Sequence, residues 1–354
     1  MSQIAIRSVG VALPDEIRTN DHWEPALTRA WMEGRRRAAE RPIPPAPTEG
    51  VAKVRQAMAD ANEDPFCGGI QRYHHPKDQP PSALEARACR DALDRAGIDA
   101  SEIDFILEYT TTPDFLVHPN APILHRELGL RRDCLALSND GVCNAFHLQL
   151  HLADQLLRGG RYRRGLLVQG CFFTWVHPHE VPFATWNGDA ATAVVVELSE
   201  THGLLADAHR TVSSLACGVV VGQPGEHWTN PGANLAYLED KEASRLMLEG
   251  VADMGAEVVH AALSEAGLGV DDVDFYASHQ ASVWFRRVTQ EVIGLHRAKS
   301  VDTYPWAGSV GAANIPLVLA TGEREGLLRP GDIVAAYSGG SGVTVSGSVL
   351  RWGI

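Results

Sequence analysis

An internal repeat constrains the fold of this chain more than any other feature of its sequence. Residues 92–105 read ALDRAGIDASEIDF, and residues 262–275 read ALSEAGLGVDDVDF. Ala, Leu, Ala, Gly, Asp and Phe recur at one constant offset. Each copy has the pattern of a helix that ends in Ala-Gly, followed by a short acidic connection and a strand.

A second pair of matching segments lies farther along the chain at nearly the same offset. Leu156-Leu157-Arg158 precedes the apolar run 165–170, and Leu327-Leu328-Arg329 precedes the apolar run 332–337. Two matched landmarks at one spacing are unexpected by chance. They indicate an internal duplication of a unit rich in strands and helices.

The duplication predicts an α/β protein with two similar halves. We expect an N-terminal half at residues 1–198 and a C-terminal half at residues 199–354, which meet after the apolar run 190–198. Alternating helices and apolar strands imply layers in which helices cover largely parallel sheets. A stretch with many Pro and Arg residues at about 22–64 reads as an insertion, either a lid or a dimer contact.

Composition excludes several classes of partner. The 354 residues are 45% hydrophobic and 21% charged, as in ordinary globular proteins. A net charge of −13 argues against nucleic-acid binding. No stretch reaches the ~20 apolar residues of a membrane span, and no signal peptide is evident. The six cysteines form no CxxC motif, so we expect free thiols in a cytoplasmic protein.

One cysteine stands at the start of an apolar segment in the first half. Cys143 follows the turn-rich run 138–142 and precedes residues 146–157, which we predict to be a buried helix. Unpaired N–H groups at a helix N-terminus favour a thiolate, so we expect a lowered pKa and a nucleophile. The alternative is a buried cysteine that only packs.

The second repeat places a histidine opposite this cysteine. The strand of that copy leads into His279, and sites in such sheets lie beyond the carboxyl ends of strands. Cys143 and His279 therefore form a candidate Cys–His pair, although a hydrogen-bonded structural histidine is the alternative. The N–H groups of Cys143 and Ser341, in the Gly-rich run 338–342, are candidates for an oxyanion hole.

The whole chain resembles the thiolase-fold ketosynthases of the ketoacyl-ACP synthase III type. The resemblance implies a five-layered αβαβα fold, a homodimer, an acyl thioester on Cys143 and His279 as the catalytic histidine. We expect no cofactor. The order and spacing of several segments carry the resemblance: the opening strand, the Cys143 helix, Asn187-Gly188-Asp189-Ala190, His279-Gln280-Ala281, the loop Gly308 to Pro316, and the final Gly-rich turn with Ser348 to Trp352.

One expected catalytic residue is replaced. In the family, an asparagine follows the glycine that aligns with Gly308, and here that position is Ser309. Condensing members use the His/Asn pair to bind the malonyl thioester carbonyl while decarboxylation builds an enolate. A hydroxyl reaches less far and has one donor fewer, and loss of one oxyanion donor costs roughly 3–4 kcal/mol. Ser309 is instead a candidate for orienting His279.

We therefore expect an acyltransferase of natural-product biosynthesis. It would take an acyl or aroyl group from an acyl carrier protein or acyl-CoA thioester, hold it on Cys143 and pass it to the hydroxyl or amine of a small acceptor. His279 would be the general base. A condensing enzyme that forms a carbon–carbon bond is the alternative. A non-catalytic partner subunit is a third, against which the retention of Cys143 and His279 counts.

Several residues near the expected pocket are candidates for substrate contact. The run His177-Pro178-His179 invites a metal interpretation, but it lacks the necessary carboxylate or histidine spacing, so we predict no metal site. Aromatic residues in this region can equally belong to the core or to an interface. The predicted substrate-binding residues are Phe115, His118, Trp186 and Asn314.

Overall fold

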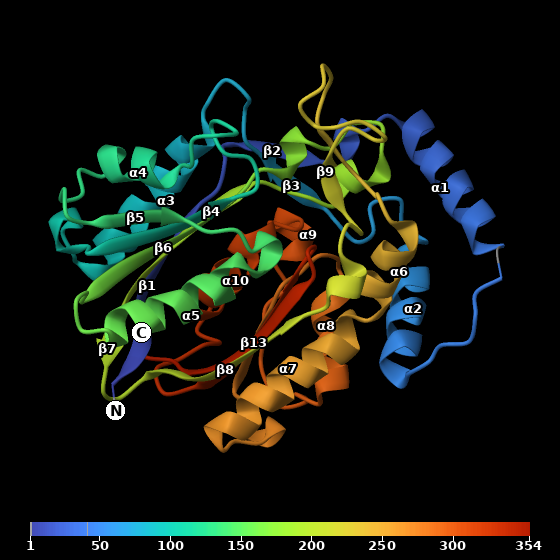
Figure 1. Ribbon diagram of the computed structural model, residues 1–354. Coiled ribbons are helices and arrows are strands. Elements are labelled where there is room, and N and C mark those ends of the chain that lie inside the picture. Colours follow the sequence, from blue (N-terminus) through green and yellow to red (C-terminus); the bar gives the residue numbers. More distant parts are fainter. Residues whose placement is uncertain (1, 41) are drawn as a thin grey trace.

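Two mixed sheets form the framework of the molecule (Figure 1). The computed structural model describes residues 2–40 and 42–354. The first sheet has the strand order β1-β7-β6-β4-β5, and its strands are β1 (Gln3–Ala12), β4 (Phe105–Thr110), β5 (Leu135–Ser138), β6 (Arg164–Cys171) and β7 (Ala190–Ser199). The second has the order β11-β12-β13-β8, and its strands are β8 (Gly203–Thr211), β11 (Phe275–Ser278), β12 (Ile333–Gly340) and β13 (Thr344–Arg351).

Helices cover both outer faces and fill the space between the sheets. One hydrophobic cluster joins Phe146 and Ile315, on two central helices, to Phe105 and Phe275 on the two sheets. Separate clusters lie under the outer helices of each sheet. The predicted five-layered αβαβα arrangement is therefore confirmed. The central helices are α5 (Ala145–Arg158) and α10 (Asn314–Arg324); the outer ones are α3 (Pro81–Ala96) and α4 (Ala121–Glu127) on the first sheet, and α7 (Val251–Ala266) and α8 (Phe285–Ile293) on the second.

The repeat in the sequence is a repeat in the structure. Helices α3 and α7 both end at a glycine in the left-handed conformation, Gly97 with φ +65° and Gly267 with φ +69°. β4 then pairs in parallel with β6, and β11 in parallel with β12. The strands of the first sheet lie within residues 3–199 and those of the second within 203–351. The division at residue 198 stays a prediction.

Smaller elements lie outside the two-sheet framework. The predicted insertion at 22–64 contains α1 (Pro25–Ala39) and α2 (Glu49–Ala61), apart from residue 41, which lies outside the described residues. Arg55 on α2 forms an ion pair with Glu249 (2.9 Å), which fastens this segment to the second half. The remaining elements are β2 (Glu16–Thr19), β3 (Gln71–His74), β9 (Val220–Gly222), β10 (Leu235–Tyr237), α6 (Lys241–Glu249) and α9 (Tyr304–Ala307).

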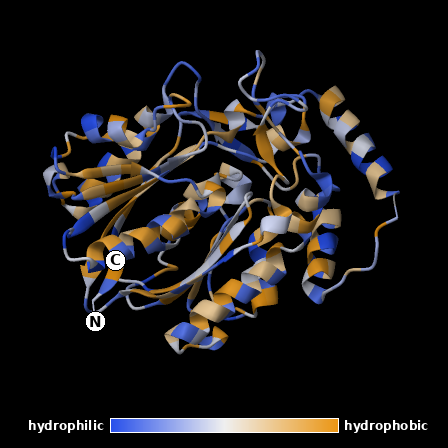
Figure 2. Cartoon of the chain, in the orientation of Figure 1, coloured by the Kyte–Doolittle hydropathy of each residue, from blue (hydrophilic) through white to orange (hydrophobic). Residues whose placement is uncertain are grey.

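The distribution of hydrophobic residues follows these layers. Figure 2 shows hydrophobic residues along the strands and on the central helices, with hydrophilic residues in the outer loops. Among the described residues, no helix combines the length and apolar character needed to span a bilayer.

Candidate active site

Cys143 lies in a strained turn directly before helix α5. Residues Val142–Asn144 form one 3-10 turn, and α5 follows from Ala145, which confirms the predicted helix. Val142 has a φ of +48°, in the left-handed region that β-branched residues rarely adopt. Asp140 Oδ1 accepts a hydrogen bond from Val142 N at 3.1 Å and supports this turn. Such strain persists where the surroundings fix one side chain in place.

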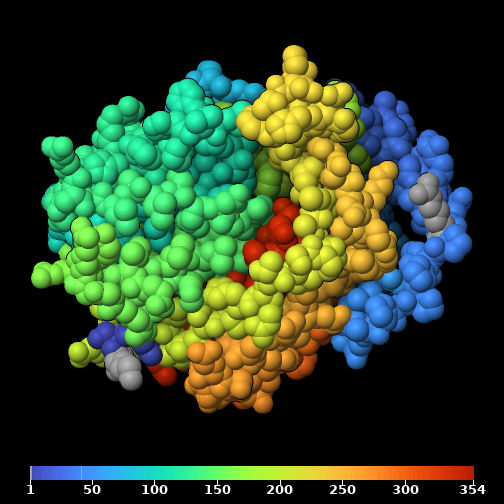
Figure 3. All heavy atoms as spheres, in the orientation of Figure 1, coloured from blue at the N-terminus to red at the C-terminus, as the bar shows by residue number. Residues whose placement is uncertain are grey.

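Strand β12 of the second half holds this turn. Ser338 Oγ donates to the carbonyl oxygen of Cys143 at 2.7 Å. At the end of β12, a Cβ on Gly340 would lie only 2.6 Å from the carbonyl oxygen of Gly141, so only glycine allows this approach. Figure 3 shows a surface hollow whose floor is made of atoms from the last part of the chain.

His279 reaches the same part of β12 from the neighbouring strand. It directly follows β11, and its backbone N–H donates to the carbonyl oxygen of Tyr337 at 2.8 Å. Tyr337 precedes Ser338, so Cys143 and His279 are tied to adjacent residues of β12. The structure thus brings the predicted pair to one place, and the catalytic roles of the two residues stay a proposal.

Asn314, at the start of α10, orients the His279 ring. Its side-chain Nδ2 lies 3.2 Å from His279 Nδ1 and 3.3 Å from the carbonyl oxygen of Gly311. Because the Gly311 oxygen can only accept, this atom is the amide nitrogen, and it donates to Nδ1 as well. The proton of the neutral imidazole therefore sits on Nε2. Asn314 Oδ1 is buried without a hydrogen-bond partner.

Burial keeps both members of the pair uncharged. It raises the pKa of the Cys143 thiol to about 12 and lowers the pKa of His279 to about 4. The sequence predicted a lowered pKa for Cys143, and that prediction is wrong. Exclusion from water disfavours the thiolate by more than the start of α5 favours it. At pH 7 a neutral thiol accompanies a neutral imidazole.

Comparisons with known proteins agree with this fold. The family model for 3-oxoacyl-[acyl-carrier-protein] synthase III matches residues 139–212, and the model for the C-terminal part of that enzyme matches residues 263–352. The first match contains Cys143, and the second contains His279 and Asn314. The chain is a ketoacyl-ACP synthase III-like protein of the thiolase superfamily.

Whole-length relatives support this membership. β-Ketoacyl-[acyl-carrier-protein] synthase III of Brucella melitensis is 27% identical over 99% of this chain and 100% of its own length; the enzyme of Brucella canis is 29% identical over 76% and 84%. The fold is shared with 3-oxoacyl-(acyl carrier protein) synthase III of Pseudomonas aeruginosa (TM-score 0.78, 23% identity, 99% of both chains). It is also shared with cerulenin-bound OleA of Xanthomonas campestris (TM-score 0.78, 20% identity, 99% and 98%).

Ser309 of this synthase III-like chain is fixed by its backbone. Its N–H donates to the carbonyl oxygen of Trp186 at 2.7 Å, and its own carbonyl accepts from Gly188 N at 3.1 Å. Among the described residues, no hydrogen bond joins the Ser309 hydroxyl to His279. The contact that the sequence left open, with Ser309 as a candidate, is instead made by Asn314.

The other predicted residues differ in how near they lie to the turn Val142–Asn144, called the thiol turn below because it carries Cys143. Ser341 follows Gly340 in the turn between β12 and β13, next to the thiol turn. Trp186 lies beside the Ser309 loop. Phe115 and His118 stand on an exposed loop, and the Phe115 residue is 63% exposed. Within residues 2–40 and 42–354, no hydrogen bond joins either side chain to Cys143.

Sequence reasoning missed two residues that shape the site. Ser338 supports the Cys143 carbonyl, and only its place at the end of an apolar strand could have indicated it. Buried Tyr109 packs with Ala145 and Ala312 next to the thiol turn. Its position at the end of the first repeated strand, equivalent to the end that bears His279, was the available signal.

Proposed function

We propose that this chain is an acyltransferase of natural-product biosynthesis. Cys143 takes an acyl or aroyl group from a carrier-protein or coenzyme A thioester and passes it to the hydroxyl or amine of a small acceptor. The coarser activity, a transferase of the synthase III type, rests on the family membership. The choice of a heteroatom as acceptor is the proposal.

The arrangement around His279 carries this proposal. An enolate needs two donors beside the substrate carbonyl, and Ser309 offers a short hydroxyl on a backbone that Trp186 and Gly188 fix. Asn314 does not replace the missing amide, because it is fully buried and contacts the ring at Nδ1. Only Nε2 remains for a substrate. One donor is enough for the tetrahedral intermediates of acyl transfer when backbone N–H groups share the charge.

One proton leaves Cys143 in the first half-reaction, and one proton returns to it in the second. Cys143 Sγ attacks the donor thioester carbon, and the donor thiol leaves with the proton that Cys143 gives up. The acceptor oxygen or nitrogen then attacks the Cys143 thioester, and its proton returns to Sγ. His279 moves this proton at Nε2 once its ring proton is on Nδ1. The carbonyl oxygen of Gly311, which lies beside the His279 ring, can accept the Nδ1 proton in that state.

Condensation is the second candidate function. The whole-length relatives from Brucella are named β-ketoacyl-[acyl-carrier-protein] synthase III, and in the described tautomer His279 is an N–H donor of the kind that an enolate oxygen requires. An acceptor that is already a stabilised carbanion would need no decarboxylation and would fit the same site.

We also propose a homodimer. The loop residues Phe115, Leu116 and Val117 are 63%, 72% and 92% exposed, and the edge strand β5 presents Leu135 and Leu137. A second copy would cover these side chains, and Phe115 and His118 would then lie against that copy, near its Cys143. Sedimentation should give twice the chain mass, and Val117→Arg should shift the protein toward monomer.

A partition experiment tests the proposed acceptor. The protein, loaded with an acyl group, is offered malonyl thioester in one reaction and a panel of small alcohols and amines in another. We expect ester or amide formation and no carbon dioxide from the wild type. Ser309→Asn should gain carbon dioxide release. Carbon dioxide and a ketoacyl product from the wild type would contradict the acyltransferase proposal and establish condensation.

A further inference from the structure

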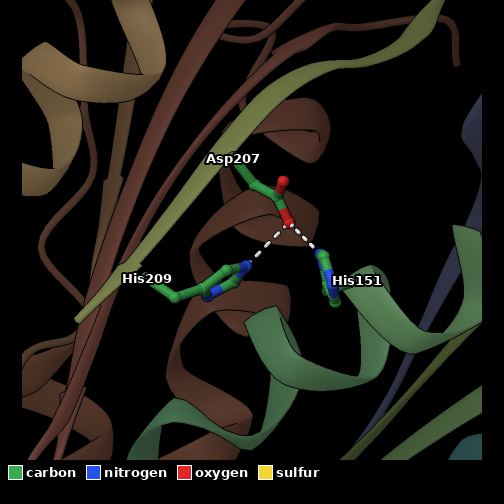
Figure 4. A group of neighbouring side chains, drawn as sticks. All are labelled: His151, Asp207 and His209. Atoms are coloured by element: carbon green, nitrogen blue, oxygen red, sulfur yellow. Dashed lines mark hydrogen bonds and ion pairs between the residues drawn. The ribbon is translucent and has the colours of Figure 1, made fainter. Parts of the chain in front are cut away.

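A second group of reactive side chains lies between α5 and the second sheet. Figure 4 shows His151 on α5 and Asp207 and His209 on β8, with their side chains directed toward one point. Asp207 Oδ2 lies 2.8 Å from His151 Nδ1 and 2.8 Å from His209 Nε2. The three candidate ligand atoms all lie within 4.8 Å of one another. The expectation of no metal site concerned His177 and His179, not these residues.

The spacing of these residues along α5 and β8 fits a metal site better than it fits an accidental contact between side chains. His147 and His151 are four apart on one face of α5, and Asp207 and His209 are two apart on one face of β8. Two elements thus each direct a pair of side chains into the same layer. Two imidazole nitrogens and a carboxylate oxygen are ligands of the zinc type.

Two serines on β13 lie within hydrogen-bond distance of the Nδ1 atoms of His209 and His147. Ser346 lies opposite His209 in the strand pairing, and its Oγ is 2.7 Å from His209 Nδ1. A metal-binding histidine usually donates its other ring N–H to such a partner, which fixes the free nitrogen toward the ion. Ser348 lies opposite Asp207 and is 3.0 Å from His147 Nδ1.

His147 lies in the same layer but is not one of the three grouped ligand residues. The residue is only 2% exposed, and its Nε2 is buried without a hydrogen-bond partner. Buried imidazole nitrogens ordinarily have a partner, so a water molecule is expected beside this one. His151, by contrast, has a 42% exposed side chain, which leaves a path for an ion to enter.

We propose that His151, Asp207 and His209 bind one divalent ion of the zinc class, with water in the remaining position. Tetrahedral zinc keeps ligand atoms about 3.3 Å apart, so the two 2.8 Å separations from Asp207 need to widen by about 0.5 Å, and the two imidazole nitrogens lie within 4.8 Å of each other. His209 Nε2 and His151 Nδ1 coordinate as neutral imidazoles, and their protons move to Nδ1 and Nε2. Mg²⁺ and Ca²⁺, which prefer six or more oxygen ligands, do not fit.

The proposed site connects to the catalytic turn. Ser346 Oγ also accepts a hydrogen bond from Asn144 Nδ2 at 2.8 Å, and Asn144 directly follows Cys143. An ion bound to His209 would therefore restrict the motion of Ser346 and, through it, of Asn144 next to the nucleophile. The site itself is separate from the residues proposed to transfer the acyl group.

Metal titration of the full chain tests the site. After treatment with a chelator and a thiol reductant, the protein is titrated with Zn²⁺ in competition with a chromophoric chelator. We expect one equivalent to bind, and His151→Gln, Asp207→Asn and His209→Gln each to weaken binding by at least about tenfold. His296→Gln, at an exposed histidine, is the matched control and should change nothing. Excess Mg²⁺ should not compete.

Two further readouts separate this site from cysteine binding and from misfolding. Co²⁺ should give visible d–d bands without thiolate charge transfer, and the Cys143→Ser, Cys217→Ser double variant should bind as the wild type does. Zn²⁺ should raise the melting temperature of the wild type but not of Asp207→Asn. The proposal is overturned if no stoichiometric binding occurs, if all three ligand variants bind normally, or if removing the two thiols abolishes binding.

Discussion

At the scale of single residues, burial decides the chemistry of the candidate pair. Because the pKa is about 12 for Cys143 and about 4 for His279, neither side chain is charged at pH 7. The Cys143 thiol must therefore lose its proton during attack on the thioester. Cysteine proteases differ, because their thiolate exists before the substrate arrives.

Alkylation of Cys143 should consequently depend steeply on pH. Below a pKa of about 12 the thiolate fraction grows about tenfold for each pH unit, so the iodoacetamide rate should grow about 100-fold from pH 7 to 9. Peptide mapping distinguishes Cys143 from the exposed Cys217. A rate that is independent of pH in this range, and that falls in His279→Ala, would show a thiolate–imidazolium pair instead.

Replacing Asn314 should change how His279 titrates. In Asn314→Asp the carboxylate accepts from Nδ1–H and stabilises the imidazolium, so the pKa of His279 should rise above about 4. The acid limb of the kcat profile should move to higher pH, because activity needs the neutral ring. Asn314→Ala is the uncharged comparison and should lower kcat without that movement. Identical acid limbs in the wild type and Asn314→Asp would contradict this role.

At the scale of elements, close approach between β12 and the thiol turn fixes the geometry of the site. Gly340→Ala would press a Cβ against the Gly141 carbonyl, and a displacement of about 1 Å can lower turnover about 100-fold. Gly339→Ala is the neighbouring control, because its Cβ would meet a Val345 methyl group at 3.1 Å and its next neighbours only at 3.8 and 3.9 Å. Steady-state kcat of the two variants measures the difference; equal values would contradict the proposed contact.

Local sequence patterns predicted the elements better than the contacts between them. The apolar run 146–157 indicated α5, because this pattern depends on a single element. The hydrogen bond between Asn314 and His279 joins residues 35 positions apart and depends on how α10 and β11 pack. The contact between His151 on α5 and Asp207 on β8 likewise joins residues 56 positions apart and depends on how these two elements pack. No local pattern encodes either contact.

At the scale of the whole molecule, the duplication predicted most of the architecture. Two copies of a helix–strand unit can bury their inner faces only against each other, which gives two sheets with helices between them. The electrostatics of the interior were not predictable in this way. Burial depth follows from the packing of all five layers, so the direction of the Cys143 pKa shift was missed.

Buried carboxyl groups make the stability of the molecule depend on pH. Glu85 on α3 is fully buried, and burial, followed by the charge of Glu108, raises its pKa well above the usual value. The unfolded chain releases this proton near pH 4, whereas the folded chain keeps it. Stability should therefore fall as the pH rises above about 4.

Glu85→Gln should remove this loss of stability at higher pH. At pH 8 we expect the free energy of unfolding to rise by about 1–3 kcal/mol, the usual cost of an incompletely satisfied buried polar group. At pH 4, where the wild-type carboxyl is protonated in both states, the difference should shrink. Asp94→Asn, at an exposed position on the same helix, is the control. Denaturant unfolding at both pH values measures the effect, and destabilisation at pH 8 would contradict it.

The acyl thioester on Cys143 is the claim on which the proposed function depends. Intact-protein mass spectrometry after incubation with acyl-carrier-protein and coenzyme A thioesters tests it directly. The mass should increase by one acyl group, the adduct should map to Cys143, and Cys143→Ala should show none. No adduct with any donor, or an adduct that persists in Cys143→Ala, would contradict the account.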